Sequence, residues 1–252
     1  MIEIFDMDQG SEDWFRVRVG IPTASELSTV LSEGRADGTM PNAMIDAMVK
    51  SGCTAQQLAA AVKAAKGKNS NPAAMRSKYL RQLAGEVVTG ELAESYTNAH
   101  MDRGRTMEDE ARDLYAFIHD ADLQRVGFIK NGQKGCSPDS LIGANGGLEI
   151  KTALPHIQID RLFRGELPTE HKAQVQGSLW IAEREYWDFV SYWPKLPPLT
   201  VRVYRDEPYI QKLSDAVDAF NEELADLVER IRNYAEPRAA LKSQLVQSLM
   251  AG

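Results

Sequence analysis

The stretch Ser137-Pro138-Asp139, followed after nine residues by Glu149-Ile150-Lys151, carries the strongest fold signal in this chain of 252 residues. Between the two motifs, Gly143-Ala144-Asn145-Gly146 has the composition of a hairpin turn joining two short strands. Because Glu149 and Lys151 are two residues apart, both side chains point to the same face of a strand. A hairpin would place Asp139 beside Glu149. The stretch therefore predicts two carboxylates and an ammonium in one small patch of a sheet.

This predicted patch has the chemistry of a metal site. Two neighbouring carboxylates raise each other's pKa by repulsion, and a divalent cation removes that conflict. Mg²⁺ prefers hard oxygen ligands, so Asp139, Glu149 and the backbone carbonyl of Ile150 are candidate ligands. Lys151 would then orient or deprotonate a metal-polarised water, or stabilise charge on a phosphate. The alternative from the residues alone is a surface hairpin with a cross-strand salt bridge.

The surrounding chain predicts an α/β fold in which helices flank a central mixed sheet. Asn131-Gly132 predicts a tight hairpin turn. Ser11 predicts a helix N-terminus, and Thr23 with Glu26 predicts a second one with a capping box. The predicted strands span residues 124–130, 136–142, 147–152, 185–192 and 199–204. The predicted helices span residues 40–49, 54–65, 72–88, 105–119, 168–182 and 208–234.

Composition is that of an ordinary globular protein, with 43% hydrophobic and 26% charged residues. We expect one domain over residues 1–252, with a helical elaboration at about 33–71 and a C-terminal helix and tail at about 208–252. No apolar run approaches the roughly 18 residues of a membrane span, so no membrane partner is expected. The acidic N-terminal residues are unlike a signal peptide, and two cysteines form no disulfide framework. A cytoplasmic location is therefore expected.

The net charge of −7 is unevenly distributed. Eight acids and three bases give residues 207–236 a charge of −5, so the remaining residues carry only −2. Acids also gather at metal sites, where the cation offsets them. The charge is therefore compatible with a DNA partner, but it excludes a protein that holds DNA mainly by a large positive excess.

Four sequence blocks in a fixed order resemble the YqaJ-type viral recombinases, the phage lambda exonuclease family of PD-(D/E)XK nucleases. These blocks are Trp14–Glu26, Gly104–Arg112, Cys136–Asp139 with Gly147–Lys151, and Ala173–Trp180. The resemblance implies a restriction-endonuclease-like α/β core. Residues 33–71 depart from the family pattern.

The resemblance assigns a role to each matching site residue. Glu108, Asp139 and Glu149 correspond to the metal-binding carboxylates, Lys151 to the catalytic lysine, and Gln174 to a helix glutamine that lines the site. From the residues alone, Glu108 could equally be one of several solvated helix acids. Gln174 could likewise satisfy a buried carbonyl.

The resemblance also implies contacts with the DNA end. Arg18 and Ser25 correspond to residues that hold the 5′-phosphate, which suits a guanidinium fork and a hydroxyl near a helix N-terminus. Met101 falls where the family places an apolar wedge. A pairing of Arg18 with Glu12 or Asp13 is the alternative from the sequence.

The implied function is a Mg²⁺-dependent exonuclease, with Mn²⁺ as a substitute ion. It would digest one strand of linear duplex DNA from 5′ to 3′ and leave 3′ overhangs for strand annealing. The resemblance further implies a homotrimeric ring, a single-strand annealing protein as partner, and phage or prophage origin. An endonuclease or repair nuclease with the same core, or a non-catalytic DNA-end-binding subunit, remains an alternative.

Overall fold

The structure is a computed structural model that describes residues 1–32, 54, 57, 72–91 and 99–235, with side chains described from residue 106 onward in the last range. The chain divides into two compact units. The first contains Met1–Leu31 and Glu94–Val217, and the second contains Ser32–Ala93 and Asp218–Gly252. Several predictions lie outside the described residues: the helix at 40–49, the helix at 54–65 except residues 54 and 57, most of the elaboration at 33–71, and the tail beyond residue 235. The prediction of one domain over residues 1–252 stays a prediction.

A five-stranded mixed sheet in the first unit confirms the predicted α/β class. Its order is β2-β5-β6-β7-β8, in which β6 and β7 run parallel and every other neighbouring pair is antiparallel. The strands are Leu123–Gln124 (β2), Ser140–Ile142 (β5), Gly146–Thr152 (β6), Tyr186–Tyr192 (β7) and Leu199–Tyr204 (β8). The predicted strands at 147–152, 185–192 and 199–204 are confirmed within a residue.

A three-stranded antiparallel sheet, β1-β3-β4, corrects two strand predictions. Its strands are Ile2–Phe5 (β1), which the sequence analysis missed, Phe128–Asn131 (β3) and Gly135–Cys136 (β4). The predicted strand at 124–130 is wrong as one element, because it divides between β2 and β3 in different sheets. The predicted strand at 136–142 likewise divides into β4 and β5 at Ser137-Pro138-Asp139. The turn at Asn131-Gly132 is confirmed, and Gly132 has φ +62°.

Gly127 lies between β2 and β3, where the chain passes from one sheet to the other. The Gly127 N–H donates to the Phe5 carbonyl at 2.9 Å. A Cβ at Gly127 would lie 2.4 Å from the backbone oxygen and Cγ of Met7, which is far inside contact distance. The chain therefore passes from one sheet to the other where only glycine fits.

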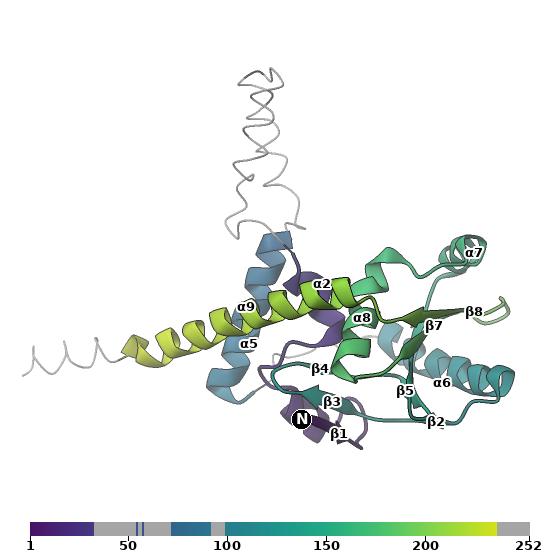
Figure 1. Ribbon diagram of the computed structural model, residues 1–252, viewed down its shortest axis with the longest axis horizontal. Coiled ribbons are helices and arrows are strands. Elements are labelled where there is room, and N and C mark those ends of the chain that lie inside the picture. The colour runs from purple at the N-terminus through teal and green to yellow at the C-terminus, as the bar shows by residue number, and fades with distance from the viewer. Residues whose placement is uncertain (33–53, 55–56, 58–71, 92–98, 236–252) are drawn as a thin grey trace, which may run out of the picture. The chain divides into compact units, whose positions relative to one another are not determined.

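Two helices cover opposite faces of the five-stranded sheet (Figure 1). Helix α6, Ala99–His119, packs Ala111 and Tyr115 into a core with Leu148 and Ile150 of β6. Helix α8, Lys172–Ile181, hydrogen-bonds to Glu149, which alternates with those residues and so points to the other face. The predicted helix at 105–119 is confirmed, although α6 begins six residues earlier. The predicted helix at 168–182 begins with a 3-10 turn, Thr169–His171 (η2), and continues as α8.

Helix α7, Pro155–Arg164, follows the site strand directly and was not predicted. Proline in its first turn and Gly165 with φ +63° at its C-terminus are ordinary boundary signals. The helix contacts β7 and β8.

Of the two N-cap predictions for the N-terminal helices, one is confirmed and one is wrong. Ser11 caps α1, Glu12–Arg18, by accepting from the Trp14 N–H. Thr23 precedes a 3-10 turn, Ala24–Glu26 (η1), followed by α2, Leu27–Val30. The Thr23 side chain makes no capping hydrogen bond, and its Oγ1 lies 3.2 Å from Ser25 Oγ instead. The predicted capping box is therefore wrong.

In the second unit, α5, Pro72–Thr89, packs against the later part of α9, Glu207–Arg232. Tyr79 stacks on Phe220 with ring centroids 5.6 Å apart, and Arg76 pairs with Glu223 at 2.7 Å. Both predicted helices are confirmed; a 3-10 turn, Asn233–Ala235 (η3), follows α9. Among the described residues, no helix is long and apolar enough to cross a membrane.

Candidate functional site

Strand β6 and helix α8 bring three of the predicted residues together. Glu149 is buried, and its Oε1 lies 2.5 Å from Nζ of Lys151. Gln174 donates its side-chain N–H to the same oxygen at 2.6 Å. The two-residue spacing in β6 thus does place Glu149 and Lys151 on one face. The buried carboxylate is held from two sides, by the ammonium of its own strand and by the amide of a helix.

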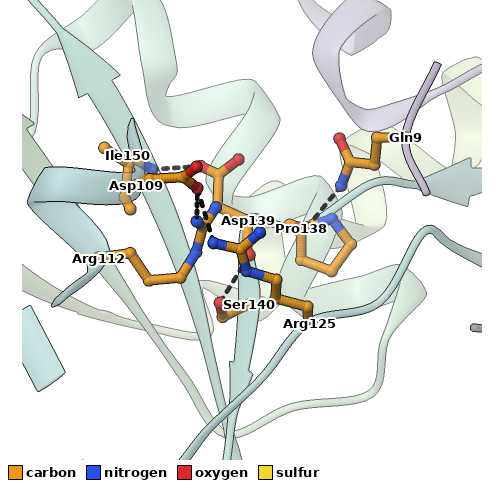
Figure 2. A network of polar contacts seen from close by, with 8 residues as sticks. All are labelled: Gln9, Asp109, Arg112, Arg125, Pro138, Asp139, Ser140 and Ile150. Atoms are coloured by element: carbon orange, nitrogen blue, oxygen red, sulfur yellow. Dashed lines mark hydrogen bonds and ion pairs between the residues drawn. The ribbon is translucent and has the colours of Figure 1, made fainter. Parts of the chain in front are cut away.

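Asp139 lies immediately before β5 and beside Glu149, as the predicted hairpin requires. Its backbone N–H donates to the Leu148 carbonyl at 3.1 Å. Its Oδ2 accepts the backbone N–H of Ile150 at 2.5 Å (Figure 2). Loss of solvation, followed by repulsion from Glu149 and Glu108, raises the Asp139 pKa well above its usual value, although Lys151 and the Ile150 N–H oppose the shift. The carboxylate therefore lies in an acidic cluster.

Glu108 joins this cluster from α6. Its side chain is half-buried, and burial is the main reason that its pKa is raised. Lys151 and Arg112 lower this pKa, while Glu149 and Asp109 raise it. Glu108 therefore lies within electrostatic reach of both charged residues of β6.

The same carboxylates raise the pKa of Lys151. Burial acts to lower its pKa, but Glu149, Asp139 and Glu108 outweigh this effect, so the pKa is raised. Lys151 is therefore an ammonium at neutral pH.

The donor set fits a hard divalent cation. Glu108, Asp139 and Glu149 are oxygen donors. Burial is the main cause of the raised pKa values of Glu108 and Asp139, and repulsion from neighbouring carboxylates adds to it. A divalent cation would relieve that repulsion. Within the described ranges, no three His, Cys, Asp or Glu side chains are already drawn together as a ligand group. The Ile150 carbonyl as a further ligand stays a prediction.

Arg18 lies next to the Pro138-Asp139 motif. Its Nη1 donates to Ser137 Oγ at 2.8 Å, and its guanidinium carbon lies 3.9 Å from the Trp14 ring centroid. Trp14 Nε1 donates to the same hydroxyl at 3.1 Å. The acid Asp13 instead pairs with Arg16. The sequence analysis placed Ser137 in the motif but did not predict that it binds Arg18.

The other two predicted DNA contacts are less well defined. Ser25 is exposed in η1, and its hydroxyl lies beside Thr23. Met101 falls within α6, but its side chain lies outside the part of the chain described here in atomic detail. Both roles stay predictions.

A charged network that the sequence analysis missed ties α6 to the segment before β3. Asp109 pairs with Arg112 at 2.5 Å and with Arg125 at 2.7 Å (Figure 2). Asp109 and Arg112 have the i, i+3 spacing of a helix-surface pair, which was the available signal. The pairing with Arg125 had no local signal. Asp109 is adjacent to Glu108 in sequence, so this network lies beside the candidate site.

Solved structures share this arrangement of sheet and helices. An alkaline exonuclease, LHK-Exo from Laribacter hongkongensis, is 26% identical with a TM-score of 0.70, over 90% of this chain and 99% of its own. The same protein has been solved in complex with dAMP. A phage-related exonuclease from Haemophilus somnus 129PT has a TM-score of 0.53 at 15% identity, over 84% of this chain and 96% of its own, and supports the fold alone. The fold is the mixed α/β fold of these exonucleases.

The family follows from the sequence model that the chain matches. The YqaJ-like viral recombinase domain matches residues 46–185, which is more than half of the chain. The protein belongs to the YqaJ-like viral recombinase family, and the predicted family is confirmed. Comparison with curated proteins gives no match.

Proposed function

We propose that the protein is a Mg²⁺-dependent exonuclease that digests one strand of linear double-stranded DNA from 5′ to 3′. The product would carry 3′ single-stranded overhangs for recombination by strand annealing. One observation carries the proposal: the buried Glu149 binds Lys151 and Gln174 beside Asp139. Membership of a viral recombinase family and the similarity to an alkaline exonuclease support it.

The carboxylates of Glu108, Asp139 and Glu149, with the Ile150 carbonyl, would hold Mg²⁺ or Mn²⁺. A bound divalent cation supplies polarisation of water and neutralisation of phosphate charge. Gln174 fixes the orientation of the Glu149 carboxylate.

Lys151 is the cation that this chain itself contributes to the reaction. Because its pKa is raised, it acts as an ammonium that orients the attacking water and stabilises charge developing on the phosphate. Its distance of 2.5 Å from Glu149 keeps it at the carboxylates rather than in solvent.

Arg18 and Ser25 would receive the 5′-phosphate of the DNA end, and Met101 would help to part the duplex. The position of Arg18 beside Ser137 supports its role, because it places a guanidinium next to Pro138-Asp139. Stacking on Trp14 restricts the side chain and so prepares it for a bidentate contact.

The assembly and the setting are also proposals. A homotrimeric ring around DNA would suit a chain of net charge −7, because a threaded substrate needs less electrostatic affinity. A single-strand annealing protein would take up the overhang. The bacterial cytoplasm, during growth of a phage or prophage, is the proposed location.

The deciding experiment uses a blunt linear duplex labelled at either the 5′ or the 3′ end, with and without Mg²⁺. We expect early mononucleotide release from the 5′ label, none without Mg²⁺, and no cutting of closed circular DNA. Lys151→Met should lose this activity, whereas Lys212→Met, at an exposed position on α9, should retain it. Cutting of the closed circle would favour an endonuclease. End binding without cleavage in Mg²⁺ would favour a non-catalytic subunit.

A further inference from the structure

An arginine outside the predicted site is anchored within the fold. Arg161, on α7, has a side chain only 11% exposed. Its Nη1 donates to Ser191 Oγ at 3.0 Å, and its Nη2 lies 3.1 Å from His171 Nε2. Because arginine carries only donors, the histidine nitrogen is the acceptor. The same Nη2 lies 3.3 Å from Glu170 Oε1.

The strand register places this arginine on the face of the candidate site. In the parallel β6–β7 pair, Ser191 lies opposite Lys151 and Phe189 lies opposite Glu149. Side chains at paired positions share a face of the sheet. His171 stacks on Phe189 with ring centroids 5.1 Å apart. The Arg161 guanidinium therefore lies on the same face as the two charged residues of β6.

The charge of Arg161 is poorly balanced for a group so far from solvent. Among the described residues, its ion-pair partner is Glu170, whose own side chain is 62% exposed. Burial, followed by the charges of Lys151 and Arg161, lowers the His171 pKa to about 4, so this ring is neutral at pH 7. Ser191 is neutral as well. The Phe189 ring, 5.9 Å from the guanidinium carbon, is neutral too, so an anion that reaches Arg161 would meet only one, solvated, competing carboxylate among the described residues.

We propose that Arg161 binds a backbone phosphate of the DNA strand that crosses the β6–β7 face, next to the phosphate that is cleaved. The inference rests on the proposed nuclease function and extends its substrate contacts beyond Arg18 and Ser25. The planar guanidinium matches a phosphate diester in a bidentate geometry. Ser191 and His171 hold the fork in place, and Glu170 yields its contact to the incoming phosphate.

The test is the salt dependence of DNA binding in Ca²⁺, measured by fluorescence anisotropy with a labelled linear duplex. Each phosphate contact contributes about 0.9 to the slope of log K against log salt for duplex DNA, and about 0.7 for a single strand. Arg161→Gln should lower the slope by about one such contact. Arg161→Lys should retain the slope, because its charge remains. Arg164→Gln is the matched control, since this arginine of the same helix pairs with Asp160 and is exposed.

A second variant tests whether a DNA phosphate replaces the Glu170 carboxylate at Arg161. Glu170→Gln should bind DNA more tightly than Glu166→Gln, because only Glu170 competes with the phosphate for the guanidinium. An unchanged slope in Arg161→Gln, or equal affinities of the two glutamate variants, would overturn the inference. If Arg161→Gln does not fold, the comparison of Glu170→Gln with Glu166→Gln decides alone. Failure of the wild type to bind or cleave linear DNA would instead overturn the proposed function.

Discussion

The side-chain amide of Gln174 lies 2.6 Å from Oε1 of Glu149, and it donates a hydrogen bond to that carboxylate. The amide comes from α8 and the carboxylate from β6, so this one bond joins a helix to the strand at the centre of the candidate site. The same oxygen contacts Lys151. Gln174 and Lys151 therefore bind the same oxygen of the Glu149 carboxylate.

Gln174→Ala should reduce kcat while DNA-end binding in Ca²⁺ is retained. A hydrogen bond to a charged group is worth about 1.5–3 kcal/mol, which corresponds to a loss of roughly tenfold to 150-fold. Initial rates on linear duplex DNA measure this. Gln176→Ala is the control on the same helix: Gln176 bonds Tyr204 and the Asp206 N–H, so its loss should lower Tm rather than kcat. Equal loss of kcat in both variants would contradict the assignment.

Asp139→Asn should abolish cleavage without destabilising the metal-free protein. The amide oxygen can still accept the Ile150 N–H, and repulsion from Glu149 and Glu108 is removed, so Tm without metal should equal or exceed the wild-type value. The increase in Tm that Mg²⁺ gives the wild type should disappear, because a ligand stabilises only a fold that binds it. Thermal unfolding with and without Mg²⁺ measures both effects.

The control for this variant is Asp160→Asn, which changes an exposed pair with Arg164 and should keep the Mg²⁺ effect. Undiminished stabilisation of Asp139→Asn by Mg²⁺ would remove Asp139 from the proposed metal ligands.

The wild type should degrade a duplex end with a 5′-phosphate faster than one with a 5′-hydroxyl, and Arg18→Ala should remove most of this preference. Charge-assisted contacts of about 1.5–3 kcal/mol predict a preference of roughly tenfold to 150-fold, which added salt should weaken. Arg16→Ala, two residues earlier and exposed, is the control. The measurement is the initial rate of degradation from each kind of end. If Arg18→Ala keeps the preference, Arg18 does not bind the 5′-phosphate.

The neutral His171 predicts a pH dependence of stability. Its pKa is lowered from 6.5 to about 4 in the folded chain, so the unfolded chain binds the proton more readily. The contribution of neutral His171 to the free energy of unfolding is therefore fully present above pH 6.5, and it is lost as the pH falls towards 4. The Tm of the wild type minus that of His171→Gln should therefore shrink between pH 7 and pH 4.5.

His156→Gln, at an exposed position on α7, is the control variant and is measured at the same pH values. A difference for His171→Gln that does not change with pH would show that folding does not lower the pKa of this ring.

Those parts of the site that follow from local spacing could be predicted from the sequence. Glu149 and Lys151 share a face because strands alternate every two residues, and a short hairpin brings Asp139 to them. The helix glutamine Gln174 came from the family pattern, and the structure gives it a partner. These predictions needed only neighbouring residues or a motif.

Features that depend on distant partners could not be predicted. Strand β1 is short and half exposed, and it forms only by pairing with β3, more than 120 residues away. The anchoring of Arg161 needs Ser191 and His171, which lie 30 and 10 residues further along the chain. The Thr23 hydroxyl turned to Ser25 rather than to its helix, which a capping pattern alone does not reveal.

The hydrogen bond from the Ile150 N–H to Asp139 lies just beyond the point where β6 stops pairing with β5. Pairing between β5 and β6 ends at Leu148, and the next amide on that side belongs to Ile150. The carboxylate thus completes the ladder and loses its rotational freedom when the chain folds. The Asp139 side chain already has a fixed rotamer before a ligand binds, so binding costs little side-chain conformational entropy. Asp139 thus has two roles: it extends the hydrogen bonding at the edge of β6, and it is a proposed metal ligand. A change that disturbs this edge of the sheet should therefore also disturb the geometry of the site.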